Sequence, residues 1–402
     1  MVNQLNASAR ILSVQAPVVP EVSEWIKKVP DTISLGQGVV FYGPPTSALE
    51  AAVAYSHEPR AGHRYGAVDG EPELRDAIEA KLLRENGISM DRENAVVVTA
   101  GSNMAFMHVL MAILEPGDEV ILPLPYYFNH EMAVRMLGGV PISVPCRSDF
   151  QLDLDRIRSA MTTRTRALVT VSPNNPTGVV YREQDLRVLN ALCGQLGIFH
   201  ISDEAYEYFT YDGHAHFSPA AISGSEGHTL SLFSLSKSFG FAGWRIGYMV
   251  IPQFLKESII KIQDTQLICP PLVSQRAAAA AMAEGQRYSG PFVSQLDVVR
   301  SFALERLKEM PSLTREPISE GAFYLWLSVN SELDSFGFAR TLVEQFRVAV
   351  IPGAAFGIDE GCTFRVSYGA LEQEMAMTGI DRLAKGIAEL GYSSEKTSRG
   401  VV

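Results

Sequence analysis

The sequence predicts an α/β protein: a large domain with a mostly parallel sheet of roughly seven strands flanked by helices, followed by a smaller α+β domain. Short apolar, β-branched runs alternate with helical patterns through the middle of the chain. Such alternation is typical of a parallel sheet that helices cover on both faces. After about residue 270 the pattern changes to longer helices with a few strand-like runs.

Seven strands are expected in the large domain, and most of them are uniformly apolar, as buried parallel strands are. They cover residues 95–99, 119–122, 140–144, 167–171, 198–202, 229–234 and 246–250. Between them, residues 104–114 are apolar nearly all round and suit a buried helix. Residues 183–196 are amphipathic and are followed by Gly197, which favours a helix C-cap.

The two ends of the chain differ from its middle. Residues 1–45 contain five prolines and little periodicity, so we interpret them as an arm or extended segment that packs on the smaller domain. Residues 46–285 form the expected large domain. Residues 286–402 form the smaller one, with a long helical segment at 292–309 and strand-like runs at 323–328, 348–351 and 364–368.

Length, charge and cysteine content exclude several classes of protein. A chain of 402 residues favours two domains, and 47% hydrophobic residues suit a large core. The net charge of -11 argues against a nucleic-acid or anionic-membrane partner. The four cysteines lie far apart, so neither a disulfide framework nor a metal site is expected. Without a signal-peptide pattern or a membrane-length apolar run, a cytoplasmic protein is expected.

Lys237 lies in a hydroxyl-rich string, Ser-Leu-Ser-Lys-Ser (234–238), eight residues before Arg245. A lysine amine can form a Schiff base with a carbonyl cofactor. Ser234, Ser236 and Arg245 are residue types that bind phosphate. Together they point to pyridoxal phosphate (PLP), an aldehyde with a phosphate tail. Taken alone, the string is more often a solvated lysine on a polar turn.

Two other strings follow predicted strands and could contact the same ligand. Gly101, Ser102 and Asn103 open a helix, and a glycine at a helix N-terminus is a suitable phosphate cradle. Tyr127 follows the next strand and could stack on a flat heterocycle. An ordinary strand–helix connection explains the first string equally well, and core packing is the commoner role for the tyrosine.

Three polar residues follow the next two strands. Asn175 lies in a rigid Asn-Asn-Pro-Thr-Gly turn that could present its amide to a ring oxygen. Asp203, if buried, needs a cation or a donor such as a pyridinium N–H. Tyr206 follows three residues later and could face the same ligand. A plain turn and an N-cap aspartate are the alternatives.

Arg365 lies on a predicted strand of the smaller domain, between apolar residues. This placement suits bidentate capture of a carboxylate. In isolation, a solvent-facing or salt-bridged arginine is the commoner case.

Taken together, these strings resemble the class I/II aminotransferases, which have PLP-dependent transferase fold type I. The resemblance runs from about Ser34 to Gly369. Asn-Asn-Pro-Thr-Gly (174–178), Ser-x-Ser-Lys (234–237) and Gly-Trp-Arg-Ile-Gly (243–247), in this order, are jointly specific. Leu-Gly-Gln-Gly (35–38) and Tyr-Gly-Ala-Val-Asp-Gly (65–70) resemble the subgroup of aspartate/aromatic, kynurenine and glutamine transaminases.

The resemblance implies a role for each cofactor-binding residue. Lys237 holds PLP as an aldimine, and Asp203 pairs with the pyridine nitrogen. Asn175 and Tyr206 hydrogen-bond the phenolic oxygen of the ring, and Tyr127 stacks on it. The implied phosphate contacts are Ser234, Ser236, Arg245, Gly101, Ser102 and Asn103.

The resemblance also implies the substrate contacts and a homodimer. Arg365 binds the substrate α-carboxylate, with Gly38 and Asn175 close by. Tyr65 reaches the phosphate of the neighbouring subunit's cofactor, which implies two shared active sites. One departure is visible: residues 39–45 read Val-Val-Phe-Tyr-Gly-Pro-Pro where many relatives have Pro-Asp-Phe. This segment often lines the side-chain pocket, so the substrate is left open.

The function implied is a PLP-dependent aminotransferase, which moves the amino group of an L-amino acid to a 2-oxo acid through a Lys237 aldimine and pyridoxamine phosphate. A β-lyase or another elimination enzyme could use the same lysine and arginine. A PLP-binding regulator without catalysis is disfavoured, because few residues precede position 35 and the chain is acidic.

Overall fold

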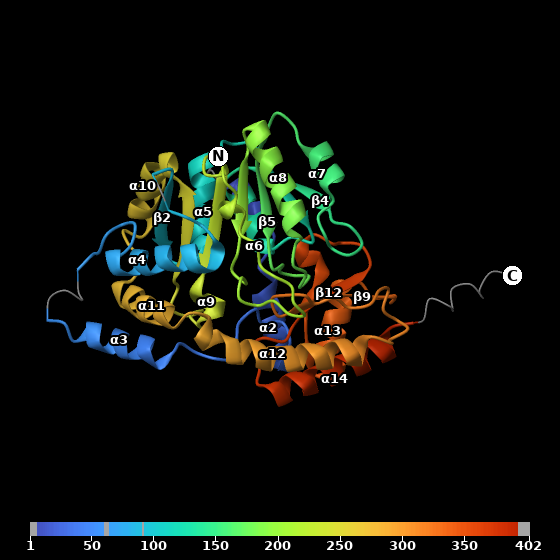
Figure 1. Cartoon of the computed structure of the whole chain (residues 1–402). Coiled ribbons are helices and arrows are strands. Elements are labelled where there is room, and N and C mark those ends of the chain that lie inside the picture. The colour runs from blue at the N-terminus through green and yellow to red at the C-terminus, as the bar shows by residue number, and fades with distance from the viewer. Residues whose placement is uncertain (1–5, 60–63, 91, 393–402) are drawn as a thin grey trace, which may run out of the picture.

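The computed structural model describes residues 6–59, 64–90 and 92–392. One part contains a seven-stranded sheet with helices packed on both faces, and the other contains a three-stranded sheet covered by long helices (Figure 1). The predicted α/β class with a mostly parallel sheet of seven strands is thereby confirmed.

The large sheet has the strand order β2-β8-β7-β6-β5-β3-β4. Every pair of neighbours is parallel except the two pairs that β8 makes with β2 and β7. The strands are β2 (Asn94–Thr99), β3 (Glu119–Leu124), β4 (Val140–Pro145), β5 (Thr165–Val171), β6 (Phe199–Asp203), β7 (Thr229–Ser234) and β8 (Gly247–Pro252). All seven predicted strands are confirmed, with ends that differ by at most two residues.

Side chains of one strand alternate between two cores, which explains why the strands are apolar throughout. Val97 packs into the core with α5, α6 and α10, whereas Val96 and Val98 pack into the core with α4 and α11. The helices around this sheet are α3 (Thr46–Ser56), α4 (Pro72–Lys81), α5 (Ser102–Ile113), α6 (Phe128–Met136), α7 (Leu154–Ala160), α8 (Glu183–Leu196), α9 (Leu235–Ser238), α10 (Lys256–Gln266) and α11 (Leu272–Glu284). As predicted, α8 ends at Gly197 in the left-handed conformation.

The smaller sheet is antiparallel and has the order β11-β12-β9. It consists of β9 (Tyr324–Val329), β11 (Ile351–Pro352) and β12 (Cys362–Ser367), and the short strand β10 (Val348–Ala349) lies apart from it. The long helices α12 (Gln286–Leu307), α13 (Ser335–Phe346) and α14 (Gln373–Leu390) share a core with β9 and β12. The domain boundaries at 45/46 and 285/286 stay predictions.

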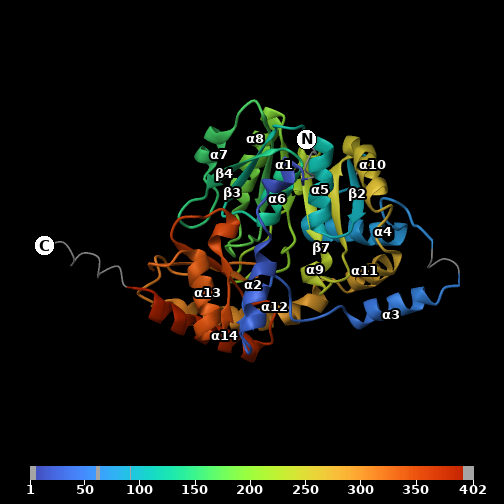
Figure 2. The same ribbon diagram turned by 180° about the vertical axis from the view of Figure 1, so that it is seen from behind.

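The N-terminal segment is more helical than predicted. It contains α1 (Ala9–Leu12) and an eleven-residue helix, α2 (Val18–Lys28), so the expected extended conformation was wrong for this stretch. Pro20 lies in the first turn of α2, where a proline removes no intrahelical hydrogen bond, so it does not interrupt the helix. Helix α2 packs on α13 (Figure 2). Strand β1 (Ile33–Ser34) pairs with β10. Helix α1 contacts α6 beside the large sheet instead.

The structure bears on two features considered in the sequence, membrane-length helices and the cysteines. None of the helices in the described ranges is long and apolar enough to cross a membrane. All four cysteines carry free thiols, and Cys146 is half-buried whereas the other three are buried.

Candidate active site

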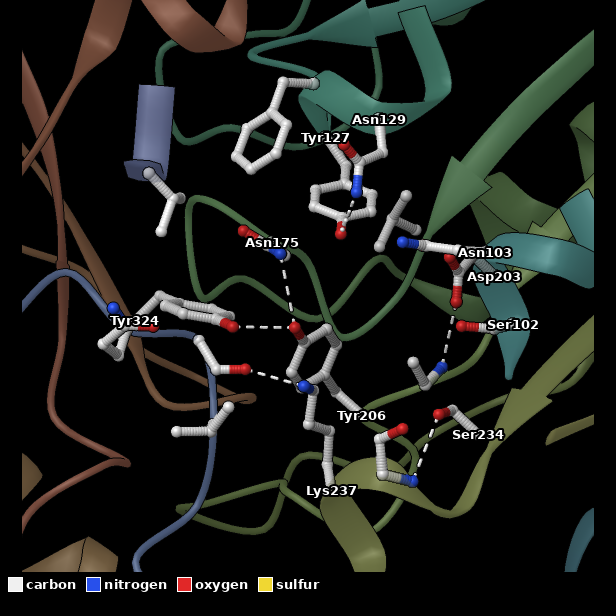
Figure 3. A pocket seen from close by; sticks show the side chains of 18 of the residues that line it. Ser102, Asn103, Tyr127, Asn129, Asn175, Asp203, Tyr206, Ser234, Lys237 and Tyr324 are labelled. Atoms are coloured by element: carbon white, nitrogen blue, oxygen red, sulfur yellow. Dashed lines mark hydrogen bonds between the residues drawn. The ribbon is translucent and has the colours of Figure 1, made fainter. Parts of the chain in front are cut away.

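A cavity of about 330 Å³ lies where the loops after β2, β3, β5, β6 and β7 converge at the carboxyl edge of the large sheet (Figure 3). Loops that follow parallel strands meet at this edge, so ligands bind there. The predicted site residues that line the cavity are Gly38, Ser102, Asn103, Tyr127, Asn175, Asp203, Tyr206, Ser234, Ser236, Lys237, Arg245 and Arg365.

Lys237 projects into the cavity from α9, the single helical turn that follows β7. Its Nζ donates a hydrogen bond to the Gly38 carbonyl oxygen at 2.6 Å. Burial lowers the pKa of the amine to about 8, and the positive charges of Arg245 and Arg365 act in the same direction. A substantial fraction is therefore neutral near pH 8, and the neutral amine is the form that attacks a carbonyl.

Asp203 ends β6 and is 4% exposed. Its Oδ2 lies 3.1 Å from His130 Nε2, and its Oδ1 accepts the Ala205 backbone N–H at 3.1 Å. An ionised carboxylate can accept about four hydrogen bonds, so Asp203 keeps capacity for another donor. No helix follows it directly, and the predicted alternative of a helix N-cap was wrong.

Asn175 and Tyr206 contact each other in the wall of the cavity. The Asn175 amide Nδ2 donates to the Tyr206 hydroxyl at 3.2 Å, and a second hydroxyl, that of Tyr324, lies 2.7 Å from the Tyr206 oxygen. Burial raises the pKa of Tyr206 well above its ordinary value, and it raises that of Tyr324 to about 12. Both hydroxyls therefore keep their protons at neutral pH and can donate hydrogen bonds.

The other side of the cavity presents hydroxyls, an arginine and a helix N-terminus. Arg245 Nη1 lies 3.4 Å from the Ser236 hydroxyl, and Ser234 caps α9 by accepting the Ser236 N–H at 3.2 Å. Arg245 adopts a left-handed backbone with φ of 55°, a conformation that costs about 1–3 kcal/mol and is concentrated at functional sites. Gly101, with φ of 87°, is the N-cap of α5, and a Cβ there would lie 2.5 Å from Arg245 Nη2. Only glycine leaves room for this arginine.

Arg365 reaches the cavity from β12 and is 2% exposed. Its Nη1 donates to Asn175 Oδ1 at 2.9 Å and its Nη2 to the Gly36 carbonyl at 2.7 Å, while its buried Nε has no partner. The guanidinium is thus held in place and still has donors to offer. It makes no ion pair among the described residues, so the predicted alternative of a salt-bridged arginine was wrong.

Tyr127 is fixed by two amide side chains rather than by core packing alone. Asn129 Nδ2 donates to its hydroxyl at 2.8 Å, and Asn103 also hydrogen-bonds it. Burial is the main cause that raises the pKa of this hydroxyl. The ring therefore presents a fixed, uncharged surface to the cavity (Figure 3).

Two predicted site residues do not line the cavity of their own chain. Gly101 lies just behind it, against Arg245. Tyr65 is 78% exposed, and its predicted contact with a neighbouring subunit stays a prediction. Phe41 and Tyr42, in the segment 39–45 that differs from many relatives, do not line the cavity either. Tyr42 stacks on Phe292 with ring centroids 4.0 Å apart and donates to the Lys237 carbonyl at 2.9 Å.

Three polar residues that the sequence did not single out complete the site. His130 contacts Asp203, Asn129 holds Tyr127, and Tyr324 contacts Tyr206. Asn129 and His130 follow Tyr127 by two and three residues, so the short helical spacing was a usable signal. Tyr324 comes from a strand far along the chain, and its sequence surroundings carry no such signal.

Comparison with known proteins identifies the family. The family model for aminotransferase class I and II matches residues 30–383. The chain is 35% identical to a probable aspartate/prephenate aminotransferase of Aquifex aeolicus, over 93% of this chain and 95% of that protein. It is also 35% identical to an aromatic aminotransferase of Arabidopsis thaliana, over 95% of this chain and 96% of that protein. The crystal structure of the aromatic aminotransferase from Pyrococcus horikoshii matches with a TM-score of 0.84 at 33% identity, covering 92% and 99% of the two chains.

The chain therefore belongs to the class I and II aminotransferases. It is a PLP-dependent enzyme that transfers the amino group of an amino acid to a 2-oxo acid. The cavity fits this cofactor on its own chemistry. Asp203 has spare acceptor capacity for a pyridinium N–H, and Lys237 offers an amine of lowered pKa. Ser234, Ser236 and Arg245 line the same cavity and are residue types that bind a phosphate.

Proposed function

We propose that Lys237, Asp203 and Tyr206 are the catalytic residues of this aminotransferase and that Arg365 binds its substrate. The observation that carries the proposal is that an amine, a buried carboxylate, a buried tyrosine hydroxyl and a buried guanidinium with a free Nε line one cavity at the carboxyl edge of the sheet. PLP, when bound, supplies an electron sink for charge that develops at the substrate α-carbon.

In this proposal the cofactor is held at both ends. Asp203, itself oriented by His130, keeps the pyridine nitrogen protonated, and Asn175 and Tyr206 donate to the ring oxygen. Ser234, Ser236 and Arg245, with Gly101, Ser102 and Asn103 at the start of α5, hold the phosphate. Tyr127 stacks on the ring. The Asp203 carboxylate thus faces the protonated ring nitrogen, and the Arg245 guanidinium faces the phosphate.

Lys237 Nζ is the base that takes the proton from the substrate α-carbon. Its lowered pKa suits this role, because general acid–base transfer is most efficient when the pKa lies near the working pH. Arg365 fixes the α-carboxylate with the donors that the protein leaves free, and Gly38 and Asn175 border that position. The α-carbon is then held beside Lys237.

We further propose that the preferred amino donor carries an uncharged side chain. Among the described residues that line the cavity, the cations are Lys237, Arg245 and Arg365, and each already has a role. Apart from Asp203, which has its own role, the remaining wall is uncharged and includes Val19, Val39 and Phe128. A second carboxylate would lose water without gaining a cation, at a cost of several kcal/mol.

A donor panel tests this specificity. With 2-oxoglutarate and with pyruvate as acceptors, phenylalanine, tyrosine and methionine are expected to give kcat/KM values at least about tenfold above those of aspartate and glutamate. Higher values for the acidic donors would refute the uncharged-donor proposal and leave the transaminase assignment intact. A cysteine conjugate that yields pyruvate without any added oxo acid would instead support β-elimination.

We propose that the enzyme is a homodimer with shared sites, in which the partner's Tyr65 contacts the phosphate. The 78% exposure of Tyr65 in the single chain supports this, as does its absence from the cavity of its own chain. We also propose the two-domain division at 45/46 and 285/286. The four free thiols agree with the proposed cytoplasmic location.

Complementation between two inactive variants tests the shared site. Mixed dimers of Lys237→Ala and Tyr65→Ala subunits contain one site with both an intact lysine and an intact partner tyrosine, so mixing after dissociation is expected to restore activity. Each variant alone should stay impaired. If mixing restores nothing although mixed dimers form, Tyr65 acts within its own subunit or has no role.

A further inference from the structure

Tyr324 contacts both Tyr206 and Arg365, the residues proposed to bind the cofactor ring oxygen and the substrate carboxylate. It opens β9, an edge strand of the smaller sheet, and its side chain is fully buried. It lines the cavity together with Tyr206, Arg365 and Gly38, and Figure 3 shows its hydroxyl directed at that of Tyr206.

The donor in the hydrogen bond between Tyr324 and Tyr206 is fixed when Tyr206 donates its own proton to the cofactor ring oxygen. The two hydroxyl oxygens are 2.7 Å apart, and Tyr206 also accepts a hydrogen bond from Asn175 Nδ2. A hydroxyl has one proton and two acceptor sites. If Tyr206 gives its proton to the ring oxygen, both acceptor sites are filled by Asn175 and Tyr324, so Tyr324 must be the donor. A hydroxyl that accepts a hydrogen bond becomes a stronger donor itself.

The aromatic ring of Tyr324 makes a second, separate contact. The guanidinium carbon of Arg365 lies 4.6 Å from the ring centroid, within the range of a cation–π interaction. Phe356 contributes another ring to the same guanidinium, at 5.1 Å. Gly38 lies against the Tyr324 hydroxyl, because a Cβ on Gly38 would come within 2.7 Å of it. The ring therefore holds Arg365, whereas the hydroxyl faces Tyr206.

We propose that Tyr324 is a positioning residue that acts on both partners of the reaction: its hydroxyl strengthens the hydrogen bond from Tyr206 to the cofactor ring oxygen, and its ring orients Arg365 for the substrate carboxylate. The inference rests on the proposed roles of Tyr206 and Arg365. Removing the hydroxyl alone and removing the ring should have different consequences, because the two contacts use different atoms.

The Tyr324→Phe holoenzyme keeps the ring and loses the hydroxyl. Its spectroscopic pKa, read from the pH dependence of the cofactor absorbance, is expected to rise by about half a unit, because the ring-oxygen anion is less well stabilised. KM for the amino donor and the oxo acid should stay at the wild-type value while kcat falls. An unchanged spectroscopic pKa in this variant would overturn the hydroxyl part of the proposal.

The Tyr324→Leu holoenzyme loses the ring as well, and its KM for both substrates is expected to rise about 3- to 30-fold. Phe356→Leu is the matched control, since it removes a ring from Arg365 without touching Tyr206: KM should rise and the spectroscopic pKa should not move. A wild-type KM in Tyr324→Leu would overturn the ring part.

Failure of the underlying function gives a different result. A wild-type holoenzyme whose cofactor absorbance did not depend on Lys237 would refute the proposed function itself. A normal wild-type spectrum combined with an unshifted Tyr324→Phe variant refutes only the role of Tyr324. Melting temperatures of the variants show whether each chain is folded when it is measured.

Discussion

The Lys237→Ala enzyme is expected to lose transamination and the absorbance that PLP shows when it is bound to a lysine amine. Two functions disappear together, because Lys237 is the amine that lines the cavity and also the proposed base at the substrate α-carbon. Loss of positioned proton transfer alone lowers rates by about 10²–10⁴-fold. Steady-state rates with the best donor, together with absorbance spectra of the reconstituted protein, measure both effects.

Lys261→Ala is a suitable control for this experiment. Lys261 lies on α10, with a side chain that is 71% exposed and paired with Glu257, so its loss should leave rate and spectrum unchanged. If Lys237→Ala retains transamination and the lysine-bound absorbance, the central assignment of the site fails.

The Arg365→Ala enzyme is expected to bind amino acids and oxo acids more weakly by similar factors. A hydrogen bond between charged groups contributes about 1.5–3 kcal/mol, which corresponds to a rise in KM of about 10- to 150-fold. Both substrate classes should be affected because both carry the carboxylate that Arg365 is proposed to bind. KM values for one donor and one acceptor, measured separately, test the prediction.

Two further arginine variants sharpen the result. Arg365→Lys keeps the charge but not the planar fork, so an intermediate KM is expected. Arg340→Ala removes an exposed arginine that pairs with Glu344 on α13, and it should change neither KM. An unchanged KM in Arg365→Ala would refute its assignment to the carboxylate.

The site residues that could be predicted from the sequence are those that come directly after a strand. Ser102, Tyr127, Asn175 and Asp203 each lie within a few residues of a strand end, and parallel strands bring such positions to one edge of the sheet. This rule depends only on the order of strands and loops. The pattern of apolar runs was therefore sufficient to predict that these residues lie close together. The chemistry of each side chain then limited what the edge could bind.

Residues that act through tertiary contacts were not accessible in the same way. Tyr324 meets Tyr206 only because the small sheet packs against the loop after β6, and nothing near Tyr324 in the sequence encodes that packing. The helix α2 was missed for a different reason: its prolines suggested an irregular segment, although a proline in the first turn is compatible with a helix. Burial against α13 supplies the remaining stability.

The position of β8 in the large sheet has a consequence for how the chain is made. Thr99 at the end of β2 pairs with Gly247 at the start of β8, so β2 stays without its only neighbour in this sheet until the ribosome has passed β8. Pairings between such distant segments form slowly, and an unpaired apolar strand can add to other chains in the meantime. Newly synthesised chains are thus most prone to aggregation before β8 emerges, and chaperones that shield β2 during that interval would raise the yield of folded enzyme.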